Sequence, residues 1–184
     1  HYMCMDHAEH IHAAWLVWQG QVPYRDFFEH HNPLFWYVLA PFVAAFYKNA
    51  LVLYAARVVS LGFYIFMFAG FYKLCREFLA VSKTVFGLAL LLPTVVLNGG
   101  MFAQCDSLYA ACALWGLALA LERKPAGAAA CFALSLAFKL QAVFLLPVVA
   151  VLWADRKLRL SDALVFLAAL AATCLLYTSP SPRD

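Results

Sequence analysis

Side chains able to do acid–base chemistry are concentrated near the start of the chain. Asp6, Glu9 and His10 are spaced by three and four residues, so on a helix they share one face. A carboxylate beside an imidazole at a membrane surface can act as a general base, and a solvated loop that touches lipid headgroups explains the same residues equally well. A metal site is a third alternative, although no spacing among the nearby histidines is diagnostic. These histidines are His7, His10, His12, His30 and His31.

Residues 20–33 form a second polar stretch, with the sequence GQVPYRDFFEHHNP. Gly20 and Pro23 indicate a turn. The aromatic residues in and after this stretch are typical of a membrane–water interface, but an interface alone does not explain the mixed charges packed between them. The stretch is therefore a candidate functional loop. Its titratable residues after the turn are Arg25, Asp26, Glu29, His30 and His31.

Three more polar residues, Arg57, Asp106 and Lys139, lie within or beside apolar segments. Polar residues at membrane depth are costly and are functional candidates by default. Snorkelling to the interface is the alternative for Arg57 and Lys139, and a helix N-cap is the alternative for Asp106. We expect all three to converge at one end of a helical bundle.

The composition indicates a membrane protein. Apolar residues make up 66% of the 184 residues and charged residues 12%, and the mean hydropathy is +0.79. A soluble domain carries about 25% charged residues, so we predict an all-α, polytopic transmembrane helical bundle. The net charge of +3 is too small to indicate a nucleic-acid partner, and membrane lipids are the expected surroundings. The apolar segments are residues 34–47, 51–72, 84–97, 107–121, 126–153 and 160–173.

Positive charges in short loops mark the cytoplasmic side of a membrane protein. The basic clusters are Lys73, Arg76 and Lys83, then Arg123 and Lys124, then Arg156, Lys157 and Arg159. Residues 1–33 and 98–106 are poor in Lys and Arg, so both are predicted to lie outside. Segment 126–153 must then turn back near Lys139, because a single crossing would move the third cluster outside. Segment 34–47 is too short to cross and is expected to be an interfacial helix.

We divide the chain into three parts. Residues 1–33 are an outer-face polar loop with a juxtamembrane helix, and residues 34–173 are the transmembrane helical bundle. Residues 174–184 resemble a translated sequencing adapter, and the chain is expected to be an incomplete piece of a longer protein. The six scattered cysteines are expected to be small apolar filler.

Several motifs together resemble the GT-C glycosyltransferases, including the protein O-mannosyltransferase-like and aminoarabinose transferase-like enzymes. The first is Asp6 followed by GQVPYRDFFEHHNPL over residues 20–34, which is similar to their first outer loop. The others, in the same order as in that superfamily, are ARVVS at residues 56–60, QCDSLY at 104–109, FKLQ at 138–141, and Pro147.

The resemblance implies an inverting membrane glycosyltransferase that takes a sugar from a polyprenyl-phosphate donor. Asp6 matches the catalytic base, although His7 stands where relatives carry Glu. Asp106 matches a second acid of the outer loops, and His31 matches a position where relatives often carry Lys near the lipid phosphate. The residues expected to bind substrate are Glu9, His10, Arg25, His30, His31, Arg57, Gln104 and Lys139.

The expected mechanism follows from charge. Asp6 takes the proton of an acceptor hydroxyl, and cations such as Arg57 and Lys139 neutralise the departing phosphate. No cofactor is implied, a divalent metal is possible, and the acceptor is a lipid, a glycan or a protein. The expected location is a bacterial plasma membrane with the site facing outward. A transporter or lipid flippase with the same outward cavity is the main alternative, and a structural membrane subunit is a third.

Overall fold

The computed structural model describes residues 5–78, 81–93, 97, 105–155 and 157–178, and within these ranges it is helical and contains no strand. The predicted all-α class is confirmed. The helices are α1 (Met5–Trp18), α2 (Leu34–Ala45), α3 (Leu51–Glu77), α4 (Lys83–Leu90), α6 (Asp106–Leu121), α7 (Pro125–Phe138), the 3-10 helix η2 (Leu140–Leu145), α8 (Leu146–Ala154) and α9 (Asp162–Thr178).

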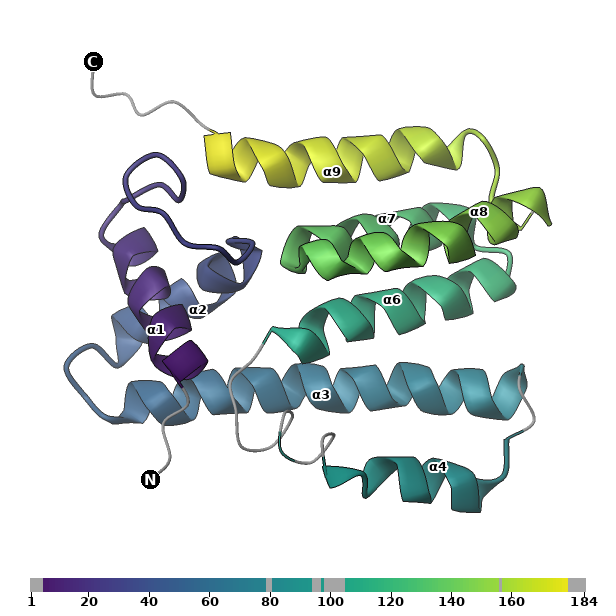
Figure 1. Cartoon of the computed structure of the whole chain (residues 1–184), viewed down its shortest axis with the longest axis horizontal. Coiled ribbons are helices and arrows are strands. Elements are labelled where there is room, and N and C mark those ends of the chain that lie inside the picture. Colours follow the sequence, from purple (N-terminus) through teal and green to yellow (C-terminus); the bar gives the residue numbers. More distant parts are fainter. Residues whose placement is uncertain (1–4, 79–80, 94–96, 98–104, 156, 179–184) are drawn as a thin grey trace.

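Four helices form a stack along the molecule (Figure 1). Helix α9 packs on α7, α7 on α6, and α6 on α3, while α4 lies along the other side of α3. Gly116 permits the close approach of α6 and α7, because a Cβ at this position would lie 3.0 Å from the Phe132 ring. Helices α1 and α2 pack on one another at one end of this stack, with α1 steeply inclined to it.

Helix α3 is the one described helix that is long and apolar enough to cross a membrane. Its 27 residues extend about 40 Å at 1.5 Å per residue. The other apolar helices are shorter, and α6, for example, has 16 residues, or about 24 Å. The described helices pack on one another, but with one helix clearly able to span a membrane the polytopic transmembrane bundle stays a prediction.

The predicted turn near Lys139 is confirmed. Helix α7 ends at Phe138, and Lys139 adopts an extended conformation with φ −153° and ψ 129°. The chain then returns through η2 and α8. Val149 and Leu152 of α8 belong to the same buried cluster as Ala128 near the start of α7, so α7 and α8 form an antiparallel hairpin.

The basic clusters meet at the end of the stack opposite to α1. Lys73 at the end of α3 forms an ion pair with Glu122 at the end of α6. Lys124 pairs with the same carboxylate at 2.8 Å. Leu158, within the third cluster, packs in the cluster that contains Ala120. The predicted grouping of these charges at one end is confirmed for the described residues, and Arg156 lies outside them.

Three segments differ in extent from their sequence-based bounds. Helix α4 ends at Leu90, and most of residues 94–104 lie outside the described residues. Helix α2 covers 12 residues of segment 34–47. This length is too short to cross a membrane and is compatible with the predicted interfacial helix. Helix α9 continues to Thr178, beyond the expected boundary at residue 174.

Candidate functional site

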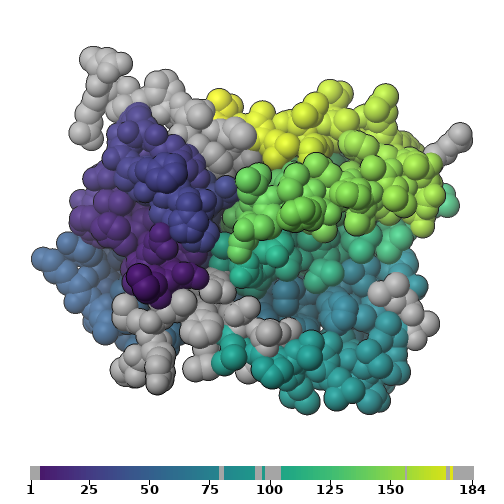
Figure 2. Space-filling view, viewed as in Figure 1, coloured from purple at the N-terminus to yellow at the C-terminus, as the bar shows by residue number. Residues whose placement is uncertain are grey.

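The candidate site lies where α1, α2 and the loop between them meet the start of α6 and the end of α7. Leu108 near the start of α6 and Phe138 at the end of α7 share one buried cluster with Ala13 of α1 and Trp36 of α2. This core fixes the polar face of α1 beside the turn at Lys139. The space-filling view shows the N-terminal segment against the green helices of the stack (Figure 2).

Asp106 and Lys139 form an ion pair at this junction. Their side chains are 36% and 20% exposed, so the pair is only partly shielded from solvent. The Lys139 Nζ also lies 5.7 Å from the centre of the Tyr109 ring. The Ser135 hydroxyl donates a 2.8 Å hydrogen bond to the Tyr109 carbonyl, which fixes α7 against α6. The structure thus brings together two of the three polar residues that were expected to converge.

The loop between α1 and α2 begins with a turn that requires glycine. Gly20 has φ +84°, a conformation that L side chains rarely adopt. Its N–H donates to the carbonyl of Val17 at 2.9 Å, and the N–H of Gln21 donates to that of Leu16 at 3.0 Å. This pair of hydrogen bonds is the Schellman arrangement, and it ends α1 as the GxxP turn predicted.

Two side-chain hydrogen bonds then hold the second half of the loop. Tyr24 adopts a strained φ of 65°, and its hydroxyl donates to the carbonyl of His31 at 2.6 Å. The Asn32 side-chain amide donates to the carbonyl of Leu136 in the last turn of α7 at 2.9 Å. The loop and the end of α7 are therefore fixed to each other, although 104 residues separate the two partners.

A pocket of about 450 Å³ opens between this loop and the chain that follows α7. The volume is in the range typical of small-molecule sites. One wall is polar and the other, formed by η2, is largely apolar. The residues around it are His30, His31, Asn32, Lys139, Leu140, Gln141, Val143 and Phe144.

His10 is a buried, neutral imidazole behind this pocket. Trp36 Nε1 donates to His10 Nδ1 at 3.2 Å, and the His31 ring lies 4.7 Å away, edge to face. Burial lowers the pKa of His10 to about 4. The charge of His31, and more weakly that of Lys139, lowers this pKa as well, while Glu29 and Asp6 oppose the shift. Since Nδ1 accepts a hydrogen bond, the proton of the neutral ring is on Nε2.

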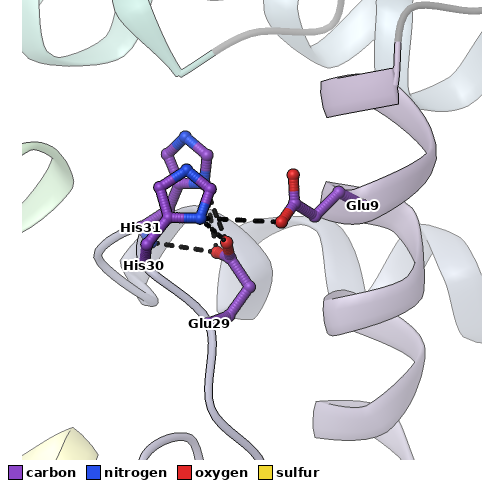
Figure 3. Close-up of side chains that lie close together, drawn as sticks. All are labelled: Glu9, Glu29, His30 and His31. Carbon is purple, nitrogen blue, oxygen red and sulfur yellow. Dashed lines mark hydrogen bonds and ion pairs between the residues drawn. The ribbon is translucent and has the colours of Figure 1, made fainter.

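Four titratable side chains, His31 among them, gather beside the pocket (Figure 3). Glu9 projects from α1 toward Glu29, His30 and His31 of the loop. His30 Nδ1 lies 2.6 Å from Glu29 Oε1 and 3.7 Å from Glu9 Oε1. His31 Nδ1 lies 3.1 Å from Glu29 Oε2. We call these four residues the Glu–His cluster.

The two carboxyl groups of the cluster interact directly. A hydrogen bond with Glu29 is the main cause that raises the pKa of Glu9. Burial alone would raise the pKa of Glu29, but the hydrogen bond with Glu9 and the backbone N–H groups of His31 and His30 lower it overall. One proton or one cation between the two carboxyl groups therefore stabilises the arrangement.

The remaining candidate residues are spread around this centre. Asp6 lies one helical turn before His10, and its charge contributes to the pKa of that imidazole. Arg57 lies 5.9 Å from the Tyr54 ring and not in the lining of the described pocket. Arg25 pairs with Asp26 at 2.6 Å in the exposed part of the loop. Gln104 lies outside the described residues.

His7 occupies the position where the resemblance would place a second acid. Its side chain is buried, with 1% of the residue exposed. Burial and the nearby Arg57 both lower its pKa, so the ring is neutral and is packed between α1 and α3. No second acidic group is present at this position.

Three residues of the site were not among the sequence-based candidates. Glu29 had been noted only as one of several loop charges, and Tyr24 and Asn32 only as parts of the motif. The sequence offered one signal for Asn32, which is its position directly before Pro33. A residue before proline is held extended and can present its side chain. The partner of Asn32 on α7 had no signal in the sequence.

Comparison with known proteins gives one match. The family model described as "alpha-(1->6)-mannopyranosyltransferase, N-terminal domain" matches residues 13–155. The match includes the loop, the pocket and the Asp106–Lys139 pair, and it begins after Asp6, Glu9 and His10. No curated protein matches, and no solved structure matches.

Proposed function

Because the chain belongs to the alpha-(1->6)-mannopyranosyltransferase family, we propose that its pocket is the sugar-transfer site of a polyprenyl-phosphate-dependent mannosyltransferase. Membership of the family supports a glycosyltransferase role. The donor, the face of the membrane and the stereochemistry belong to the proposal.

The observation that carries the proposal is the position of Lys139. Lys139 lines the pocket, and its ammonium group pairs with Asp106 at the point where α7 is interrupted. A lysine kept charged beside an otherwise apolar hairpin suits the binding of a phosphate group. A donor phosphate that enters the pocket competes with the Asp106 carboxylate for this cation, so the pair is broken as the donor binds.

The proposed reaction is a single displacement. The oxygen of the acceptor hydroxyl forms a bond to the anomeric carbon as the bond from that carbon to the phosphate oxygen breaks. The phosphate leaves with the electron pair as a polyprenyl-phosphate anion, which Lys139 stabilises. Asp6 receives the hydroxyl proton, and the anomeric configuration inverts.

Neutral His10 and the loop histidines have a supporting role in this proposal. A neutral His10 adds no positive charge beside Asp6, so it does not weaken that carboxylate as a base. Its Nε2–H is a hydrogen-bond donor. His31 and Asn32 at the pocket wall offer polar groups for sugar hydroxyls, whereas Arg25 in the exposed half of the loop is placed to meet lipid headgroups or the acceptor.

The proposed topology follows from the two ends of the stack. The basic clusters at one end fit the cytoplasmic face, and this charge pattern supports a pocket on the outer face of a bacterial plasma membrane. Helices α6, α7 and α8 are short, but they belong to one packed bundle with the long α3. The isoprenoid chain of the donor would lie against the apolar surfaces of this bundle.

The test is mannosyl transfer by the full-length protein in liposomes. The assay supplies polyprenyl-phosphate mannose and, separately, a nucleotide-activated mannose, with a mannose oligosaccharide as acceptor. We expect product only from the lipid donor, with an α-linkage formed from a β-linked donor. Asp6→Asn should reduce turnover by at least about 100-fold, as expected for loss of a general base, while Asp155→Asn at the opposite end should not. Turnover with the nucleotide donor alone, or an undiminished Asp6→Asn enzyme, would refute the assignment.

A further inference from the structure

We propose that the Glu–His cluster of Glu9, Glu29, His30 and His31 binds a divalent transition-metal ion at the rim of the pocket. The proposal concerns metal binding and does not depend on the sugar-transfer function. It rests on the donor geometry, on the way the ligands are held and on the local charge.

The donor atoms already have the spacing of a metal site. One ligand atom from each of the four side chains lies within 4.8 Å of all the others. Around a tetrahedral ion with bonds of about 2.1 Å, neighbouring ligand atoms are about 3.4 Å apart. The nitrogen–oxygen separations within the cluster are 2.6 Å from His30 to Glu29, 3.1 Å from His31 to either oxygen of Glu29 and 3.7 Å from His30 to Glu9. Side-chain adjustments of up to about 1.4 Å would therefore bring all four ligand atoms to the tetrahedral spacing.

The backbone that carries the ligands is fixed by bonds outside the cluster. Three ligands are consecutive, at residues 29–31, in the loop that Tyr24 and Asn32 anchor. The fourth, Glu9, comes from the middle of α1 and points toward them (Figure 3). A metal ion would therefore join two elements that are already held in place, and binding would require little ordering of the chain.

Charge also favours a cation at this position. Two carboxyl groups face one another here, and like charges so close cannot both ionise without compensation. With neutral imidazoles the donor set carries two negative charges, which a divalent ion balances. In the metal-free protein, a proton shared by the two carboxyl groups provides this compensation instead.

The donor types indicate which metal binds. Two imidazole nitrogens with two carboxylate oxygens suit Zn²⁺ first, and Mn²⁺ or Fe²⁺ less tightly. Mg²⁺ and Ca²⁺ prefer sites made entirely of oxygen, so they should compete poorly. His30 and His31 also line the pocket, and the His30 side chain is 68% exposed. The ion would thus lie next to whatever occupies the pocket and within reach of its hydroxyl or phosphate oxygens.

The test is calorimetric titration of the tag-free, full-length protein in detergent after removal of metal by a chelator. We expect one Zn²⁺ per chain, weaker Mn²⁺ binding, and no measurable heat from Mg²⁺ at the same concentration. Glu29→Gln and Glu9→Gln should each weaken Zn²⁺ binding at least about tenfold, since even loss of an outer-shell partner costs 10–100-fold. Glu9→Gln lies on a helix and leaves the loop anchors intact, so it remains informative where Glu29→Gln destabilises the loop.

Two control variants separate this site from other binding on the surface. His12→Gln changes a histidine on the same helix that stacks on Trp15 instead. Glu77→Gln changes a carboxylate at the far end of α3. Both should bind Zn²⁺ as the wild type does. The proposal would be overturned if Zn²⁺ did not bind stoichiometrically, or if the affinity fell with His12→Gln but not with Glu9→Gln. A failed sugar-transfer assay would leave this binding result unaffected.

Discussion

Replacing Lys139 with Met, alone and together with Asp106→Asn, measures whether the ion pair at the pocket is a stabilising unit. The two groups are in direct contact and are 20% and 36% exposed. An exposed pair contributes up to about 1 kcal/mol, and removal of one partner from a fully buried pair costs about 3–5 kcal/mol. This site lies between these limits, so we expect Lys139→Met to lower the free energy of unfolding by about 2 kcal/mol.

The cost arises because Asp106 keeps its charge and loses its partner. Asp106→Asn removes that charge as well, so the double variant should be less destabilised than the sum of the two single variants. We expect a coupling energy of about 1–2 kcal/mol, the range found for residues in contact. The measurement is unfolding of the purified protein in mixed micelles of increasing denaturing-detergent content, followed by circular dichroism.

Lys48→Met is the matched control for this cycle. Lys48 lies over the Tyr47 ring at 5.4 Å in the turn between α2 and α3, on an exposed surface. Its replacement should change the unfolding free energy by less than about 0.5 kcal/mol. Additive costs at positions 106 and 139, within about 0.3 kcal/mol, would show that the two side chains do not interact and would remove the reason for placing a phosphate at Lys139.

Three further changes test the packing and the loop. Gly116→Ala should destabilise the protein by about 1–2 kcal/mol because its new Cβ would lie 3.0 Å from Phe132, whereas Gly62→Ala, with open space around it, should be neutral or stabilising in the same unfolding assay. Asn32→Ala should release the loop from α7, which limited proteolysis would detect as faster cleavage between α1 and α2. In chelator-treated protein, stability should fall by roughly 2 kcal/mol between about pH 7 and pH 4.5 relative to a His10→Gln variant. The sign follows because the pKa of His10 is lowered to about 4 in the folded state, so the unfolded chain takes up the proton first as the pH falls; equal pH profiles for the two proteins would contradict the burial of that ring.

The helices and the turn at Lys139 could be predicted from the sequence because they follow from local pattern and charge. Apolar segments of a given length indicated the helices. The basic cluster near Arg156 was expected on the same side as the other basic clusters. Segment 126–153 was therefore predicted to turn back on itself. The same parity argument placed Asp106 and Lys139 at one end of the bundle, where the structure has them in contact.

The Glu–His cluster could not be predicted because it depends on the path of a loop. Glu9 meets Glu29 only because the chain from Gly20 folds back over α1, and the bond from Asn32 to α7 holds it there. The partner of Asn32 in that bond, Leu136, has ordinary sequence surroundings. The burial of His10 also had no local signal, since it depends on Trp36 of the following helix.

The most direct test of the account is transfer of labelled mannose from polyprenyl-phosphate mannose by the full-length protein carrying Lys139→Met, compared with Lys83→Met at the opposite end of the stack. If the pocket beside Lys139 holds the donor phosphate, Lys139→Met loses transfer by at least about 100-fold, as loss of one preorganised charge contact at a transition state does, and Lys83→Met retains it. Full transfer by a well-folded Lys139→Met protein would contradict the placement of the active site in this pocket.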